Sequence, residues 1–259
     1  MDSDREGALH PWLDFHLRSG RNRSHADDRR HRLLQASYYG LMAEVDDNLG
    51  RLFKALHAFG VWDDTLIVFT SDHGEQMGDH WLYGKAGFFD QSYHVPLIVR
   101  CPGGRASTRV KAFTEHVDIM PTMLSWLGIE VPRQCDGHTL TPFIASGDAP
   151  AGWRDAAHWQ FDFRGPDVEA ALGLHAEHCT LDVIRDEDTK YVHFAAGLPP
   201  LLFDIANDPG ELVNRATDRA QQSRVSEYAS RLLSFRMRHG DKTLTHYRVT
   251  RESGLSIRP

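Results

Sequence analysis

The sequence lacks long apolar runs, paired cysteines and any broad block of positive charge. Its longest apolar stretches, residues 66–69 and 96–99, span four residues each, far below the roughly 18 needed to cross a membrane. The three cysteines, Cys101, Cys135 and Cys179, are an odd number at wide spacing. This spacing gives neither a disulfide framework nor a zinc-finger pattern. We therefore expect no membrane partner and no cross-linked scaffold.

The charge balance argues against nucleic acid as a partner. Lysine and arginine total 29 and aspartate and glutamate total 36, which leaves a net charge of −7. The arginines near the start are interrupted by Asp27 and Asp28, so they predict a solvated face rather than a binding surface for phosphates. The polar, acidic N-terminus predicts no secretory signal. Together with the few cysteines, this favours a reducing, cytoplasmic location.

The residues that are present fit a globular α/β chain. With 259 residues, of which 41% are hydrophobic, one or two domains with a sizeable core are expected. Apolar residues at three- and four-residue steps predict a long helix over about 28–59, which Gly60 ends. The runs at 66–69 and 95–99 predict buried, parallel strands, and 117–127 predicts a second amphipathic helix. This order of elements indicates an α/β layer architecture.

The pattern changes after residue 150. Segments 180–184, 190–194 and 201–205, separated by turn residues, predict an antiparallel meander. A helix is expected from about 220 to 237. We therefore divide the chain into four parts: an irregular N-terminal segment (1–27), an α/β part (28–150), a small α+β subdomain (151–239) and an extended tail (240–259).

The tail is polar with a few scattered apolar residues. Leu244, Tyr247, Val249 and Leu255 have little to pack against within such an arm. The tail is therefore predicted to contact a neighbouring subunit and to form a homo-oligomer.

The densest polar cluster of the chain, residues 71–80, directly follows a predicted strand. Past the strand end, with Gly74 freeing the backbone, the side chains of Asp72 and His73 can turn toward one ion. A carboxylate with an imidazole suits Mn²⁺, Zn²⁺ or a Ca²⁺ site completed by other oxygens. Two ligands are too few to close such a site. The alternative is that Asp72 caps a turn and His73 is an ordinary polar residue.

Three further residues of the cluster, Glu75, Asp79 and His80, are also candidate ligands, although loops are polar in any case. If they joined Asp72 and His73, the chain would hold a self-contained zinc hydrolase site. This interpretation stays open at this point.

Lys85 lies twelve residues after His73, between Gly84 and Ala86-Gly87. Its ammonium could face an anionic group that gains charge in a transition state. The alternative is a solvated loop lysine with no role in catalysis.

Several motifs in order resemble the sulfatase branch of the alkaline phosphatase superfamily, and within it the phosphonate monoester hydrolase and arylsulfatase group. The resemblance covers about residues 38–237. It rests on the stretch 38–50, Ser71-Asp72-His73-Gly74-Glu75, Gly78-Asp79-His80 before Gly84-Lys85, Val95-Pro96-Leu97-Ile98-Val99, Val117-Asp118, Asp136-Gly137-His138, Trp159-Gln160-Phe161-Asp162-Phe163-Arg164, and the late hairpin from Leu202 to Asp208-Pro209-Gly210-Glu211.

The resemblance implies a fold, a reaction and three site residues. The fold would be an alkaline-phosphatase-like sheet flanked by helices, with the smaller antiparallel α+β subdomain after it. Asp72 and His73 would bind a divalent metal ion. Mn²⁺ or Ca²⁺ is expected, with Zn²⁺ as the alternative. Lys85 would contact the sulfate or phosphate oxygens and support the leaving group. The substrate would be a small-molecule monoester or diester of sulfate, phosphonate or phosphate.

The nucleophile motif of that family, of the type Cys-x-Pro-Ser-Arg, does not occur in this chain. Cys101 and Arg105 have the right separation, but Gly103 stands where the motif requires proline or alanine. We therefore expect the C-terminal portion of such a hydrolase, inactive alone, whose sheet lacks its leading strands and exposes an edge and apolar surface. The alternative is a non-catalytic remnant or association module.

Overall fold

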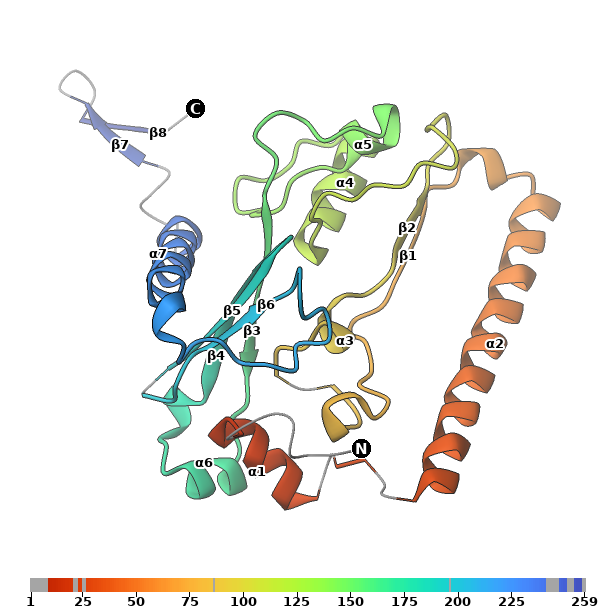
Figure 1. Cartoon of the computed structure of the whole chain (residues 1–259). Helices are drawn as coiled ribbons and strands as arrows, with labels where there is room; N and C mark the ends of the chain where they lie inside the picture. Colours follow the sequence, from red (N-terminus) through yellow and green to blue (C-terminus); the bar gives the residue numbers. More distant parts are fainter. Residues whose placement is uncertain are drawn as a thin grey trace.

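The computed structural model describes residues 9–20, 23–24, 27–85, 87–195, 197–240, 247–250 and 254–257. Within these residues the fold is mixed α/β, as expected, with two sheets between the long helices α2 and α7 (Figure 1). The helices are α1 (Pro11–Ser19), α2 (Asp28–Ala58), α3 (Asp90–Tyr93), α4 (Ile119–Trp126), α5 (Thr141–Ser146), α6 (Pro166–Leu172) and α7 (Gln222–His239). In the described part of the chain, no helix is long and apolar enough to cross a membrane.

The C-terminal part contains a four-stranded antiparallel sheet. Its strands lie in the order β3-β4-β5-β6, with β3 at Ala156–Asp162, β4 at Thr180–Asp186, β5 at Thr189–Phe194 and β6 at Leu201–Asp204. The predicted meander is therefore confirmed, and its first strand, β3, is an addition to the three predicted strands.

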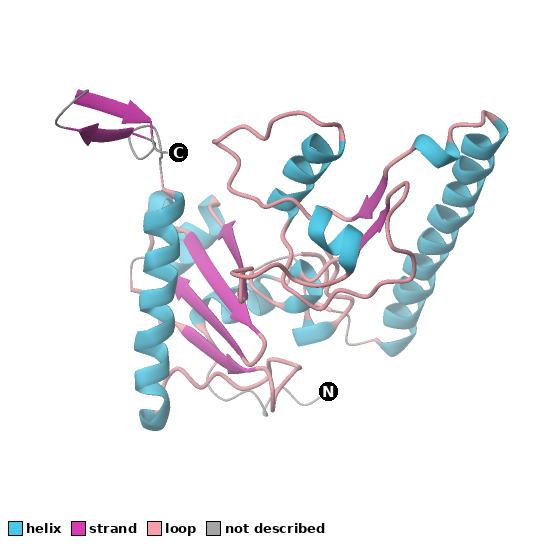
Figure 2. Ribbon diagram, turned by 90° about the horizontal axis from the view of Figure 1, so that it is seen from above, coloured by secondary structure: helices cyan, strands magenta, loops and turns pink. Residues whose placement is uncertain are grey.

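Both faces of this sheet are covered. Because side chains alternate along a strand, Val183 and Val192 join one core, together with Trp12 of α1. Their neighbours Ile184 and Tyr191 join a second core on the opposite face, which α7 closes. Figure 2 shows α7 lying along the sheet. The subdomain thus contains its own hydrophobic core.

The N-terminal segment is more ordered than predicted, since α1 replaces the expected irregular structure. The ring of His10 accepts a hydrogen bond from the backbone N–H of Trp12, and Pro11 occupies the first turn, where its missing N–H costs nothing. The Trp12 side chain is fully buried and contacts Phe88 and Phe163. A helix of nine residues has too few turns to give a clear periodic pattern, which explains the wrong prediction.

The strands β1 (Ile67–Thr70) and β2 (Leu97–Arg100) pair antiparallel, so the predicted parallel arrangement is wrong. Parallel neighbours require a crossover connection, usually a full helix. In its described residues, the segment between these strands holds turns, the 3-10 helix Asp79–Trp81 and the four-residue helix α3. It therefore returns the chain beside β1 in the opposite direction.

Helix α2 forms where the sequence predicts it, with Asp27 accepting a hydrogen bond from the Arg29 N–H at its start. None of its 31 residues is buried. Leu41 and Met42 of its apolar stripe are 62% and 55% exposed. The expected exposed apolar surface is therefore present, and α2 is its largest part.

The tail contains a hairpin of β7 (Tyr247–Thr250) and β8 (Gly254–Ile257) where an extended arm was expected. Leu244 lies outside the described residues. The predicted subunit contact through the tail stays a prediction.

Candidate active site

Asp72 and His73 lie directly after β1 and face each other. The Nε2 atom of His73 is 3.5 Å from Oδ2 of Asp72. The Nδ1 atom of His73 is 2.7 Å from the carbonyl oxygen of Gly74. A carbonyl only accepts hydrogen bonds, so Nδ1 donates to Gly74, and Nε2 is the ring nitrogen that faces Asp72. A carboxylate oxygen and an imidazole nitrogen therefore point toward the same space.

The charge state of this pair suits metal binding. Burial opposes ionisation of Asp72, but the charge of His73, the backbone N–H groups of residues 72 and 73 and the Lys85 ammonium together outweigh it and lower the pKa of Asp72. The Asp72 side chain is 83% exposed, so the carboxylate is ionised and accessible. The Lys85 charge makes the weakest of these contributions to the pKa of Asp72.

Glycine at position 74 allows the loop after β1 to lie against the segment that leads into α3. A Cβ atom there would lie 2.0 Å from the carbonyl oxygen of Gln91, which no side chain tolerates. The Gly74 N–H donates to the Ser92 carbonyl at 2.8 Å. The buried Gln76 amide donates to Ser92 Oγ at 3.0 Å. These contacts fix the backbone on which His73 is oriented.

The backbone before Lys85 is held by the same loop. The Gln76 N–H donates to the Gly84 carbonyl at 2.9 Å, and the Gly84 N–H donates to the carboxylate of Glu75. Glu75 is therefore a brace within the loop. The Lys85 side chain itself is exposed to solvent.

The self-contained zinc site is not formed. Within the described ranges, no three His, Cys, Asp or Glu side chains are arranged to hold a metal ion. The His80 ring is buried and stacks on Phe89 with 3.5 Å between centroids, while Glu75 is occupied by Gly84. The pair Asp72–His73 still fits part of a divalent-metal site, because it offers one oxygen and one oriented nitrogen donor.

Cys101 is placed away from the pair. In the β1–β2 register, Thr70 lies opposite Leu97 and Ile67 lies opposite Arg100. Asp72 therefore follows one end of the paired strands, and Cys101 follows the other. This position agrees with the expectation that Cys101 is not a nucleophile.

A buried cluster around Lys190 was missed from the sequence. The Lys190 side chain is fully buried in β5, where it donates to the Phe88 carbonyl at 3.0 Å and forms ion pairs with Asp90 and Glu211. Glu211 also accepts a hydrogen bond from the Asp90 N–H at 2.9 Å. Burial raises the pKa of Glu211, and the Asp90 carboxylate adds to this effect while Lys190 opposes it.

This cluster ties the segment just after Lys85 to the C-terminal sheet. The lysine stands in a strand whose residues 189–192 are all buried. A lysine within a strand of the predicted meander is the signal that could have pointed to it, since buried lysines are almost always paired.

The chain matches two family models. The model described as Sulfatase covers residues 16–129. The model described as N-sulphoglucosamine sulphohydrolase, C-terminal, covers residues 78–238.

Curated relatives agree with these matches. The multifunctional alkaline phosphatase superfamily protein PehA of Trinickia caryophylli is 45% identical over 270 residues, which are 98% of this chain and 52% of that protein. Arylsulfatase K of Mus musculus is 34% identical over 71% of this chain and 33% of its own length. The chain thus spans about half the length of the first relative and a third of the second.

Solved structures have the same fold. The phosphonate monoester hydrolase of Agrobacterium radiobacter superposes with a TM-score of 0.81 and 53% identity, over 87% of this chain and 45% of that one. The phosphonate monoester hydrolase SpPMH of Silicibacter pomeroyi gives a TM-score of 0.90 with 36% identity, over 99% of this chain and 53% of that one.

Proposed function

Because this chain belongs to the sulfatase family, we propose that it contributes Asp72, His73 and Lys85 to the active site of a sulfate or phosphonate/phosphate ester hydrolase. The observation that carries the proposal is the orientation of His73. Its Nδ1–H donates to the Gly74 carbonyl, and its Nε2 lies 3.5 Å from Oδ2 of the Asp72 carboxylate.

Each residue has a defined task in this proposal. Asp72 and His73 hold a divalent cation, which would supply positive charge to the reacting group when bound. Lys85 places its ammonium against the oxygens that gain negative charge as the ester bond breaks. Glu75 and Gly74 keep both parts of the loop in place through backbone contacts. The nucleophile is supplied by a segment of polypeptide that this sequence does not include.

The relatives support both ester classes. The similar solved structures carry the name phosphonate monoester hydrolase, and other relatives carry the name arylsulfatase. The cytoplasmic location is a further part of the proposal, supported by three cysteines that are all free.

A chimera tests the proposal. The part of the Trinickia caryophylli protein that precedes the matched region is joined to this chain, and hydrolysis of 4-nitrophenyl sulfate and of a phenyl phosphonate monoester is measured. We expect no turnover by the 259-residue chain alone and turnover of at least one substrate by the chimera. Lys85→Ala should lower the chimera's kcat about 10²-fold, the cost of one charge-stabilising donor.

Lys111→Ala is the matched control, because Lys111 is an exposed lysine outside residues 71–85, and it should leave kcat unchanged. A folded chimera without activity, or one indifferent to Lys85→Ala, contradicts the proposal. Robust turnover by the chain alone contradicts the expectation that part of the active site comes from elsewhere.

The exposed apolar surface favours a second candidate, a non-catalytic association module. At least half of the residue surface is exposed at Leu41 on α2, at Val117 just before α4 and at Met120 on α4. This alternative predicts an inactive but folded chimera, together with a chain that forms a stable complex by light scattering.

A further inference from the structure

Helix α3 lies between the β1–β2 pair and the four-stranded sheet, and it is bonded to residues on both sides (Figure 1). On the side of the sheet, the carboxylate of Asp90 forms ion pairs with Lys190 and, at 3.3 Å, with Arg185. The Asp90 N–H donates to the Glu211 carboxylate at 2.9 Å. Three charged side chains from beyond residue 150 therefore hold the first residue of α3.

On the other side, Ser92 of α3 holds the loop that follows β1. Ser92 is 1% exposed, its carbonyl accepts the Gly74 N–H at 2.8 Å, and its Oγ accepts the Gln76 side-chain amide at 3.0 Å. The His94 N–H donates to the Asp90 carbonyl at 2.7 Å, which closes the single turn of α3. Because this turn is closed, a displacement of Asp90 also displaces Ser92.

The Gly74 backbone transmits the position of α3 to His73. A Cβ atom on Gly74 would lie 2.0 Å from the Gln91 carbonyl oxygen, so the loop lies directly against α3. The Gly74 carbonyl in turn accepts a hydrogen bond from Nδ1 of His73 at 2.7 Å. That bond fixes the orientation of the ring and thereby the direction of Nε2. A continuous series of contacts thus leads from Glu211 to His73.

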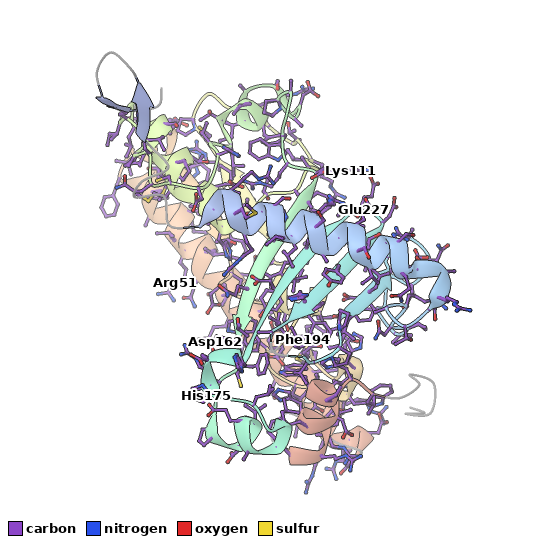
Figure 3. The ribbon with its side chains drawn as sticks, turned by 90° about the vertical axis from the view of Figure 1, so that its left-hand side faces the viewer. Arg51, Lys111, Asp162, His175, Phe194 and Glu227 are labelled. Atoms are coloured by element: carbon purple, nitrogen blue, oxygen red, sulfur yellow. The ribbon has the colours of Figure 1, made fainter. Side chains whose placement is uncertain are left out.

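Apolar packing alone does not give α3 its orientation. Phe88 and Phe89, which precede Asp90, are each 1% exposed within the core of the sheet. The ring centroids of Phe88 and Phe194 are 6.1 Å apart, and Figure 3 shows Phe194 at the end of the sheet nearest α1. Apolar contacts are non-directional, whereas charge-assisted hydrogen bonds depend on the angle between donor and acceptor. The charged side chains around Asp90 therefore supply the orientation.

We propose that Asp90 and Glu211 are positioning residues for the metal site, because they hold α3 in the orientation that directs Nε2 of His73 toward the ion. The inference rests on the proposed function, since it takes His73 as a metal ligand. It gives Glu211, which lies outside the loop of the site, a part in metal binding without contact to the ion. Removal of a partner that orients a metal ligand typically weakens metal binding by about 10–100-fold.

Nuclear magnetic resonance of the ¹⁵N-labelled chain tests the orientation directly. Long-range ¹H–¹⁵N spectra at about pH 8, where ordinary imidazoles carry one proton, show which ring nitrogen holds it. His73→Gln identifies the His73 signals. We expect the proton on Nδ1 in the unmodified chain, and Glu211→Gln should shift His73 toward a mixture of both tautomers. Glu227→Gln, the same change in an exposed glutamate of α7 (Figure 3), should leave the signals unchanged.

Metal affinity is measured in the chimera described above, by electron paramagnetic resonance of free Mn²⁺. Glu211→Gln should weaken Mn²⁺ binding about tenfold, the lower end of the usual range because Glu211 acts through α3. Glu227→Gln should leave the affinity unchanged. Ser92→Ala removes the acceptor for Gln76 but leaves the charged side chains in place, and it should shift the His73 signals in the same direction. It replaces Glu211→Gln if circular dichroism shows that variant to be unfolded.

Unchanged His73 signals or an unchanged Mn²⁺ affinity in the folded Glu211→Gln variant would overturn the positioning role and leave the charged cluster with a role in stability alone. If Ser92→Ala takes its place, unchanged His73 signals there have the same meaning. His73→Gln separates this failure from failure of the proposed function. A chimera that binds Mn²⁺ equally well with His73→Gln would show that His73 is not a ligand, whatever holds its ring.

Discussion

Helices α7 and α2 are both amphipathic, yet only α7 buries its apolar side chains. Tyr228 and Leu232 of α7 are each 5% exposed against the four-stranded sheet, whereas no residue of α2 is buried. A periodic pattern therefore predicts that a helix forms, but not whether its covering partner lies in the same chain. The sheet face under α7 is covered from within the C-terminal part, whereas α2 has no buried face among the described residues.

The largest effect is expected from removing the buried charge of the C-terminal sheet. Lys190→Met leaves Asp90 and Glu211 close together without a cation and should lower the free energy of unfolding by about 3–5 kcal/mol. Urea denaturation measures this change. Lys111→Met, on an exposed lysine, should change it by less than about 0.5 kcal/mol. A loss below about 1 kcal/mol for Lys190→Met would show that the cluster is not needed.

A matched pair of leucines compares the two helices directly. Leu232→Ala should cost about 3 kcal/mol, the usual loss for a buried leucine. Leu41 of α2 is 62% exposed, so Leu41→Ala should lower the free energy of unfolding by less than about 0.5 kcal/mol. Thermal or urea unfolding gives both values. Equal losses would mean that another surface covers α2 in solution.

His10 gives the C-terminal core a dependence on pH. Burial lowers the pKa of His10 from 6.5 to about 4, although the Pro199 carbonyl opposes this shift. The unfolded chain therefore binds the proton more readily, so stability is complete above pH 6.5 and falls as the pH decreases toward 4. The free energy of unfolding should drop by about 2 kcal/mol between pH 7 and pH 5.

The structural reason lies in the two nitrogens of the His10 ring. One donates to the Pro199 carbonyl, and the other accepts the Trp12 N–H. Protonation removes the acceptor at the start of α1. His10→Asn keeps a helix cap without titrating and should flatten this part of the pH profile. An unchanged slope in His10→Asn would assign the effect to other groups.

The smallest expected effect concerns the open side of α2. A Cβ atom at Gly40 or Gly50 would have no neighbour within 4 Å. Gly40→Ala should therefore raise the helix stability by about 0.5–1 kcal/mol, and Gly50→Ala serves as an independent repeat. The helical signal in thermal denaturation measures both. A destabilised Gly40→Ala would reveal close packing against this face.

Local sequence signals identified most of the secondary structure. The meander, α2, α4 and α7 each follow from apolar spacing and from glycine or turn residues at their ends. The antiparallel pairing of β1 and β2 did not follow, because strand direction depends on the connecting segment. Helix α1 is stabilised by Trp12 packing onto distant residues such as Phe163, which no local pattern reveals.

Part of the candidate site was also predictable from local sequence signals. Asp72, His73 and Lys85 stand within fourteen residues of one another, and their residue types and the family motifs indicate chemistry. The wrong zinc alternative arose because a sequence does not show where Glu75 and His80 point. The Glu75 carboxylate accepts a hydrogen bond from the Gly84 N–H, and the His80 ring stacks on Phe89.

The contact between Glu211 and Asp90 joins positions 121 residues apart. During translation, the loop with Lys85 leaves the ribosome long before its anchor has been made. That loop can reach its final position only after the Asp-Pro-Gly-Glu turn has emerged and packed against β5. A nonsense codon anywhere between positions 94 and 211 would therefore leave Asp72, His73 and Lys85 in the product, yet remove the anchor of the segment that follows Lys85.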